Sequence, residues 1–206
     1  MIQFHDVQQR SYEWFDLRAG KLTASEAGKW LIGDNKTSLE AREKMICKKI
    51  AEERGYESPP IFENWYMKRG TELEKAAVES FSKETGFAVE EMGFISDDEL
   101  SAGCSPDGII KGLPEGFEGK APAPETHIRY LLRPQLLEDA YYWQVHFSLA
   151  IADFEVWHLQ SYCPNLPAVR CRVTRNEDTK ELQEGIRKFS QLLEESKAKI
   201  LSSVLT

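Results

Sequence analysis

The chain has 206 residues, of which 41% are hydrophobic and 29% are charged, and its net charge is −8 at pH 7. This composition excludes a membrane protein, a collagen-like chain and a mostly disordered chain, and the length predicts a single domain over residues 1–206. The acidic surplus argues against a general nucleic-acid-binding protein, because such proteins usually carry a basic surplus.

Helical periodicity dominates the first part of the chain. Ser11 is placed to cap the first helix, and the spacing of Thr37 and Glu40 is that of a capping box at the start of the third. Gly86 follows the fourth helix, and glycine is typical of a helix end. The predicted helices span residues 11–17, 23–31, 37–55 and 64–85.

Short strands separated by turn residues begin after the fourth helix, and a further helical region follows Pro122 and Pro124. The core order is therefore helix, three strands, helix and two strands, with helical additions at both ends. This order predicts a fold of the α/β (α+β) class. The predicted strands span residues 87–95, 103–110, 116–121, 154–162 and 168–174, and the predicted helices span residues 135–151 and 178–204.

The four cysteines are too few and too scattered for a disulfide framework. No Cys-x-x-Cys pair is present, so we do not expect a zinc site. The first ten residues show no apolar signal region, and the longest apolar stretch, residues 145–152, is too short to span a bilayer. We therefore expect a cytoplasmic protein without a membrane partner.

Two acidic residues in the strand region carry the main chemical signal. Asp107 lies near the end of the predicted strand over residues 103–110, and Glu118 lies eleven residues later, on the next predicted strand. If the two strands form a hairpin, their backbones lie about 4.8 Å apart and both carboxylates reach one face. Two such carboxylates repel each other unless a cation lies between them, and hard oxygen ligands favour Mg²⁺ or Mn²⁺.

Lys120 completes this pattern, because it lies two positions after Glu118 and projects to the same face of its strand. An ammonium group there can orient a water molecule and stabilise charge on a phosphate. Metal, acid pair and lysine together indicate a site of phosphodiester hydrolysis. The bare pattern also arises by chance, and an ordinary surface ion pair is the alternative interpretation.

The motifs around this pattern resemble those of a known family. The Pro-Asp pair with Glu-Gly-Lys resembles the signature of the PD-(D/E)xK nuclease superfamily. Four further blocks resemble the lambda-exonuclease (YqaJ-type viral recombinase) family and occur in its order. They are WFDLR at residues 14–18, TASE at 23–26, RGTELE at 69–74 and YYWQV at 141–145.

The resemblance implies roles for residues at the metal site. Asp107 and Glu118 would be metal ligands, the Gly119 carbonyl a third ligand, and Glu74 would approach the same metal ions from its helix. Lys120 would position the attacking water. Gln144 and Tyr141, three apart on a helix, share a face and would support the lysine or contact the substrate. The alternatives are a solvated carboxylate for Glu74 and ordinary packing for Gln144 and Tyr141.

The resemblance also implies a pocket for a 5′-phosphate. Arg18 with the Ser25 hydroxyl and free N–H groups at a helix start would form it, and Ser105 would add a second hydroxyl. Trp14 would stack on a base or simply anchor the first helix, and Arg69 would also contact the DNA. The alternative for Arg18 is an ion pair on its own helix, with Asp16 or Glu13.

The family resemblance implies a restriction-endonuclease-like core in which a central mixed sheet is flanked by helices. It implies a metal-dependent exonuclease that digests double-stranded DNA ends from 5′ to 3′ and leaves 3′ overhangs for recombination by strand annealing. Mg²⁺ would be the cofactor, with Mn²⁺ able to substitute. A homotrimer, a single-strand annealing protein as partner, and a bacterial or phage-infected host cell are further implications. The alternatives are a restriction-type or repair-type endonuclease of the same superfamily and a non-catalytic DNA-end or protein-binding module.

Overall fold

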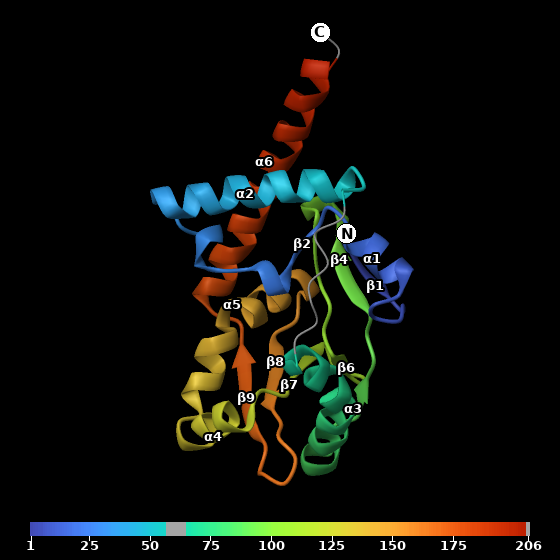
Figure 1. The fold of residues 1–206 in the computed structure, drawn as a ribbon, viewed down its shortest axis with the longest axis vertical. Coiled ribbons are helices and arrows are strands. Elements are labelled where there is room, and N and C mark those ends of the chain that lie inside the picture. Colours follow the sequence, from blue (N-terminus) through green and yellow to red (C-terminus); the bar gives the residue numbers. More distant parts are fainter. Residues whose placement is uncertain (57–64, 205–206) are drawn as a thin grey trace.

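The computed structural model of the protein describes residues 1–56 and 65–204. Its described part consists of two β-sheets with helices packed around and between them (Figure 1). The strands are β1 (Ile2–His5), β2 (Leu22–Thr23), β3 (Val89–Glu90), β4 (Phe94–Asp97), β5 (Ala102–Cys104), β6 (Gly108–Ile110), β7 (Glu115–Lys120), β8 (Val156–Ser161) and β9 (Val169–Thr174). The α-helices are α1 (Tyr12–Arg18), α2 (Lys36–Glu53), α3 (Trp65–Thr85), α4 (Pro124–Leu132), α5 (Gln135–Ala152) and α6 (Glu177–Val204), and the 3₁₀ helices are η1 (Ala24–Glu26), η2 (Lys29–Leu31) and η3 (Asp98–Leu100).

Both sheets are mixed. The first has the strand order β1-β4-β5-β2 and the second has the order β3-β6-β7-β8-β9. The β2–β5 and β7–β8 pairs are parallel, and the other pairs are antiparallel. The predicted α/β class, in which mixed β-structure is flanked by helices, is therefore confirmed.

The strands are divided between two sheets, whereas the sequence predicted one central sheet. The predicted strand 87–95 is split into β3 and β4, and the predicted strand 103–110 is split into β5 and β6. In each case the two pieces belong to different sheets. Pro106 lies at the second break, and because proline has no N–H to donate, it interrupts a strand ladder. The chain therefore passes from one sheet to the other at the segment that leads into Asp107.

The N-terminal region differs most from the prediction. β1 was not predicted, and the expected helix over residues 23–31 is instead β2 followed by the single turns η1 and η2. Gly28 has extended backbone angles between these turns, so no continuous helix forms there. The predicted cap Ser11 is confirmed for α1, but α2 is capped by Asn35 and not by Thr37. Residue 64, the predicted start of the fourth helix, lies outside the described residues.

α5 is the central helix of the fold. Its second half, from Val145 to Ala152, is buried on all sides, as expected for a helix segment that is apolar except at His146 and Ser148. It contacts strands of both sheets as well as α6 and η1. α3 packs on β7 and β8 at one end of the molecule, while α6 runs past α2 to the opposite end (Figure 1). In the part of the chain that the structure describes, no helix is long and apolar enough to cross a membrane.

Candidate active site

The two strand carboxylates meet where β6 and β7 pair. The pairing is antiparallel, with Gly108 opposite Phe117, and the Asp107 N–H donates to the Phe117 carbonyl over 3.1 Å. The Asp107 carboxylate turns back across the hairpin and accepts a hydrogen bond of 2.7 Å from the Gly119 N–H. Burial, followed by the charge of Glu118, raises the pKa of Asp107 well above its usual range. The hairpin geometry predicted from the sequence is therefore present.

Glu118 accepts two hydrogen bonds on one oxygen. Lys120 Nζ lies 2.5 Å from Glu118 Oε1, and Gln144 Nε2 on α5 donates to the same oxygen over 2.8 Å. The Lys120 ammonium also lies 4.8 Å from the centre of the Tyr141 ring. These contacts join α5 to Glu118 and Lys120, and Tyr141 also packs against the hydrophobic core, as the alternative interpretation expected.

Lys120 stays positively charged in this cluster. Burial lowers its pKa, but the negative charges of Glu118 and Asp107 together outweigh burial and raise the pKa above its usual value. A lysine with a raised pKa does not act as a general base at neutral pH. Its chemistry is therefore electrostatic, because it can hold a water oxygen or stabilise the charge that develops on a phosphate.

Glu74 approaches the same cluster from α3. Its side chain is partly buried, and burial is the main cause of its raised pKa. The charges of Glu118 and Lys120 act on it as well. α3 packs on β7, which carries both of these residues. Glu74 therefore differs from a fully solvated helix carboxylate, which was the alternative interpretation.

The oxygen atoms of this cluster fit a hard divalent cation. Asp107 and Glu118 each keep one carboxylate oxygen that makes none of the hydrogen bonds described above, and the Gly119 backbone, directly after Glu118, donates its N–H to Asp107. Within residues 1–56 and 65–204, no three acidic, histidine or cysteine side chains are grouped closely enough to form a ligand set by themselves. Mg²⁺ suits such a site, because it commonly takes one or two carboxylates and retains several waters.

A second polar cluster lies two residues before Asp107 in the chain, around Ser105. Arg18 Nη1 donates to Ser105 Oγ over 2.8 Å, and its guanidinium stacks 4.2 Å above the Trp14 ring. The Trp14 indole N–H lies 3.1 Å from both Ser105 Oγ and the Gly93 carbonyl. Among the described residues Arg18 forms no ion pair with Asp16 or Glu13, so the alternative of a pairing on its own helix is wrong.

Ser25 lies on η1 with an exposed side chain, and its hydroxyl is 3.5 Å from that of Thr23. The expected helix start at this position is a single 3₁₀ turn, so it supplies fewer free N–H groups than a full helix would. The following residue, Glu26, is near enough to Arg18 to act on it electrostatically. The structure therefore brings Arg18 and Ser105 into contact and places Ser25 on the neighbouring turn.

A buried ion cluster supports this turn and was not predicted. Lys49 on α2 is 3% exposed and lies 2.8 Å from Glu26 and 2.9 Å from Glu52. Lys48 pairs with Glu26 over 2.6 Å. The sequence contains a signal for this cluster, because Lys49 falls on the same buried face of α2 as Ile46. A lysine on the apolar face of a helix requires a buried acidic partner.

Arg69 lies apart from the Arg18 cluster. Its guanidinium donates to the Pro122 carbonyl over 3.4 Å and approaches Cys163 Sγ at 3.5 Å. These contacts link the start of α3 to the segments that follow β7 and β8, on the side of Lys120.

Known proteins resemble the chain in both sequence and fold. The family model of the YqaJ-like viral recombinase domain matches residues 13–155. The alkaline exonuclease LHK-Exo of Laribacter hongkongensis is 26% identical and superposes with a TM-score of 0.76, over 95% of this chain and 100% of its own. The structure of LHK-Exo in complex with dAMP matches equally well.

A phage-related exonuclease from Haemophilus somnus 129PT is 15% identical, with a TM-score of 0.61 over 85% of this chain and 96% of its own, which shows a shared fold. No curated protein matches the sequence significantly.

Proposed function

The chain belongs to the YqaJ-like viral recombinase family, and on this premise we propose that it is a metal-dependent exonuclease that digests double-stranded DNA ends from 5′ to 3′. The product would be a 3′ single-stranded overhang for homologous recombination by strand annealing. The observation that carries the proposal is the convergence of Asp107, Glu118, Lys120 and Gln144 on one partly buried hydrogen-bonded cluster.

Each residue of this cluster has a defined task in the proposed reaction. Asp107, Glu118 and the Gly119 carbonyl would hold Mg²⁺, for which Mn²⁺ can substitute, and Glu74 would approach from α3. When bound, the metal ion supplies Lewis-acid activation of the phosphodiester and of water. Lys120 holds the water oxygen and balances charge on the phosphate, while Gln144 fixes the orientation of Glu118.

The cluster around Arg18 suits the terminal phosphate of the strand being digested. Burial lowers the pKa of Arg18, and a phosphate would offset that loss of hydration with a charge-assisted contact. Ser105 is hydrogen-bonded to Arg18, and Ser25 is the exposed hydroxyl of the next turn. The Trp14 ring stacks against the Arg18 guanidinium. We assign Arg69 and Tyr141 to contacts with the DNA backbone near Lys120.

A closed assembly would keep such an enzyme on its substrate. One chain of 23.6 kDa has too little surface to surround a duplex, and a cyclic homotrimer is an economical solution. Metal ions and inward-facing arginines would neutralise the DNA backbone although the whole chain is acidic. We infer that the protein acts beside a single-strand annealing protein in the cytoplasm of a bacterial or phage-infected cell.

Digestion of end-labelled DNA tests the proposal directly. Linear duplex labelled at the 5′ or the 3′ end is incubated with and without Mg²⁺, with Asp107→Asn as the inactive control. We expect Mg²⁺-dependent release of the 5′ label first, a protected 3′ strand and no cutting of closed circular DNA. Cutting of circular DNA would instead indicate the endonuclease alternative, and the absence of any cleavage would contradict both.

A further inference from the structure

The loop between β1 and α1 is held against the segment that leads into Asp107. The Gln9 side-chain amide donates to the Pro106 carbonyl over 2.8 Å and to the Met92 carbonyl over 3.2 Å. On the same side, Val7 lies so close to Gly93 that a Cβ atom at Gly93 would be 2.0 Å from the Val7 carbonyl oxygen. The position of this loop is therefore fixed relative to the candidate metal site.

Arg10 has an unusual backbone conformation within this loop. The Ser11 N–H donates to the Gln8 carbonyl over 3.1 Å, which closes a β-turn with Arg10 at its third position. The φ angle of Arg10 is 68°, in the left-handed region. A positive φ at the third position is typical of a type II turn, where glycine is favoured because other side chains are strained. Strained residues of this kind are concentrated at functional sites, where the surrounding structure holds them.

The side chain of Arg10 is exposed. Within the described ranges it makes no hydrogen bond and no ion pair. The turn itself would accept glycine without strain, so neither the turn nor a hydrogen bond or ion pair with the described residues explains an arginine at this position. An exposed guanidinium with no hydrogen-bond or ion-pair partner in the described part of the chain remains available for a ligand.

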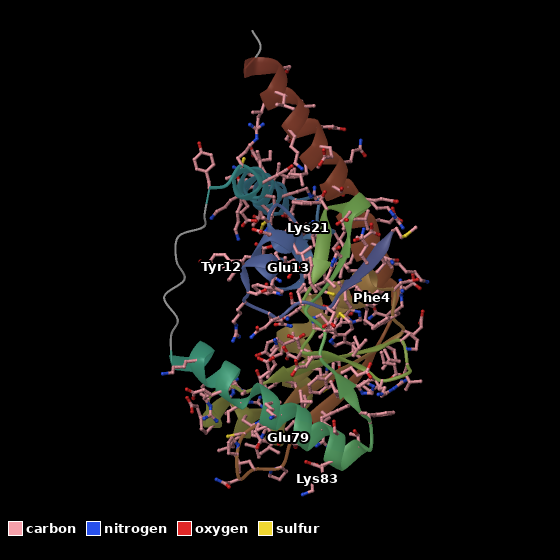
Figure 2. All side chains as sticks on the ribbon, turned by 90° about the vertical axis from the view of Figure 1, so that its right-hand side faces the viewer. Phe4, Tyr12, Glu13, Lys21, Glu79 and Lys83 are labelled. Atoms are coloured by element: carbon pink, nitrogen blue, oxygen red, sulfur yellow. The ribbon has the colours of Figure 1, made fainter. Side chains whose placement is uncertain are left out.

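The charge of Arg10 acts on the acidic cluster. Burial raises the pKa of Glu74, and among the charged neighbours Arg10 opposes that rise more strongly than Lys120 does. In Figures 1 and 2, α1 lies on the same side of the molecule as α3, and Tyr12, two residues after Arg10, is on the side between α2 and α3. The guanidinium therefore lies near enough to Glu74 for its charge to act on that carboxylate.

We propose that Arg10 binds a backbone phosphate of the DNA strand that enters the metal site. This inference rests on the proposed nuclease function. The acidic cluster repels a phosphodiester, and a guanidinium near Glu74 compensates this repulsion and can bind a phosphate with two parallel hydrogen bonds. Arg10 differs in this role from Arg18, which is packed on Trp14 and bonded to Ser105. Arg18 suits the strand terminus, whereas Arg10 suits an internal phosphate.

Two variants of Arg10 separate its ligand role from its effect on the fold. Arg10→Gly removes the guanidinium and relieves the left-handed strain, so its melting temperature should exceed that of the wild type. Arg10→Gln removes the charge but retains a side chain. Both should weaken binding of 5′-phosphorylated duplex roughly tenfold or more, because a charge-assisted contact is lost. Both should also reduce the slope of log affinity against log salt by about 0.9, which corresponds to one phosphate contact.

Two control variants match these changes elsewhere in the chain. Arg187→Gln removes one positive charge from an exposed ion pair with Glu184 on α6, and the salt slope should not change. Ser101→Gly relieves a φ of 44°, and it should raise the melting temperature without changing DNA binding. Binding is measured in an Asp107→Asn background so that the DNA is not digested.

The outcomes distinguish this inference from the proposed function. If the enzyme digests linear DNA but both Arg10 variants retain its affinity and its salt slope, Arg10 is not a phosphate ligand and the nuclease function still stands. A lower melting temperature in Arg10→Gly would assign a structural role to Arg10 and overturn the inference. If the unaltered chain neither binds nor cuts DNA, the proposed function fails, and this inference fails with it.

Discussion

Arg18 donates a hydrogen bond of 2.8 Å to the Oγ atom of Ser105, although the two residues lie 87 positions apart in the chain. Ser105 is two residues before Asp107, so this bond connects the first helix to the acid pair. A phosphate held by Arg18 would therefore lie at a fixed position relative to the candidate metal site. Recognition of the strand end and hydrolysis would be coupled through this short segment.

Arg18→Ala should reduce the preference for a 5′-phosphate. A charge-assisted contact contributes about 1.5–3 kcal/mol, or roughly one to two powers of ten in rate when it is formed in the transition state. The unaltered enzyme should digest 5′-phosphorylated duplex much faster than 5′-hydroxyl duplex. The variant should digest the 5′-phosphorylated duplex more slowly and the 5′-hydroxyl duplex at an unchanged rate. Arg187→Ala is the matched control on α6. Equal slowing of both substrates would show that Arg18 does not bind the terminal phosphate.

Asp107→Asn should abolish cleavage while stabilising the metal-free protein. The substitution removes a partly buried carboxylate whose pKa is raised by burial and by the charge of Glu118. Thermal unfolding should show a higher melting temperature for the variant without metal. Addition of Mg²⁺ should raise the melting temperature of the unaltered protein but not that of the variant. Digestion by the variant at the normal rate would remove Asp107 from the site.

Lys120→Ala should lose about 10²–10³-fold in the rate of cleavage, because it removes a charge that acts on the reacting phosphate. Mg²⁺ should still raise the melting temperature of this variant, since the carboxylates remain. A full rate of cleavage with Lys120→Ala would contradict the assigned role.

Gln144→Leu should slow cleavage about 10-fold to 100-fold, as expected when a partner that orients a metal ligand is lost. The Gln144 amide donates a hydrogen bond of 2.8 Å to Glu118. Gln135→Leu, at an exposed amide on the same helix that bonds Asp139, is the control and should retain full activity. An equal effect of both substitutions would indicate a general change in α5 and not a loss of orientation at Glu118.

Light scattering should give a mass of three times 23.6 kDa for the protein in solution. This prediction follows from the need to retain a long duplex during digestion, which a closed ring achieves. A monodisperse monomer that digests long DNA without dissociating would contradict it.

Glu26 should make folding stability depend on acidic pH. Burial alone would raise its pKa, but its contacts with Lys49, Lys48 and Thr23 outweigh burial and lower the pKa from 4.5 to about 2. Because the folded-state pKa is below the unfolded value, the stabilisation is fully present above pH 4.5 and is lost as the pH falls to about 2. The shift corresponds to about 3 kcal/mol at most.

The pH dependence of Glu26→Gln tests this assignment. The free energy of unfolding is measured by denaturant titration between pH 6 and pH 2 for the variant and the unaltered chain. The stability difference between them should shrink as the pH falls through this window. A difference that does not depend on pH would show that the ion cluster does not stabilise the fold.

The sequence alone was sufficient for the hairpin of Asp107, Glu118 and Lys120. Strand alternation and a short turn determine which side chains share a face over so short a distance, and these are local properties. The same holds for the cap at Ser11 and for the helices with clear apolar periodicity. The family motifs extended this local information to Gln144 and Arg18, but only as implied roles.

Tertiary structure decided the rest, because pairing between distant segments depends on burial across the whole chain. It divided the strands between two sheets at Pro106, and it placed α5 between them so that Gln144 reaches Glu118. It replaced the expected helix over residues 23–31 with single turns tied to Lys49. It also placed Arg10 in a left-handed turn beside Glu74, since a backbone angle imposed by packing has no signature in the local sequence.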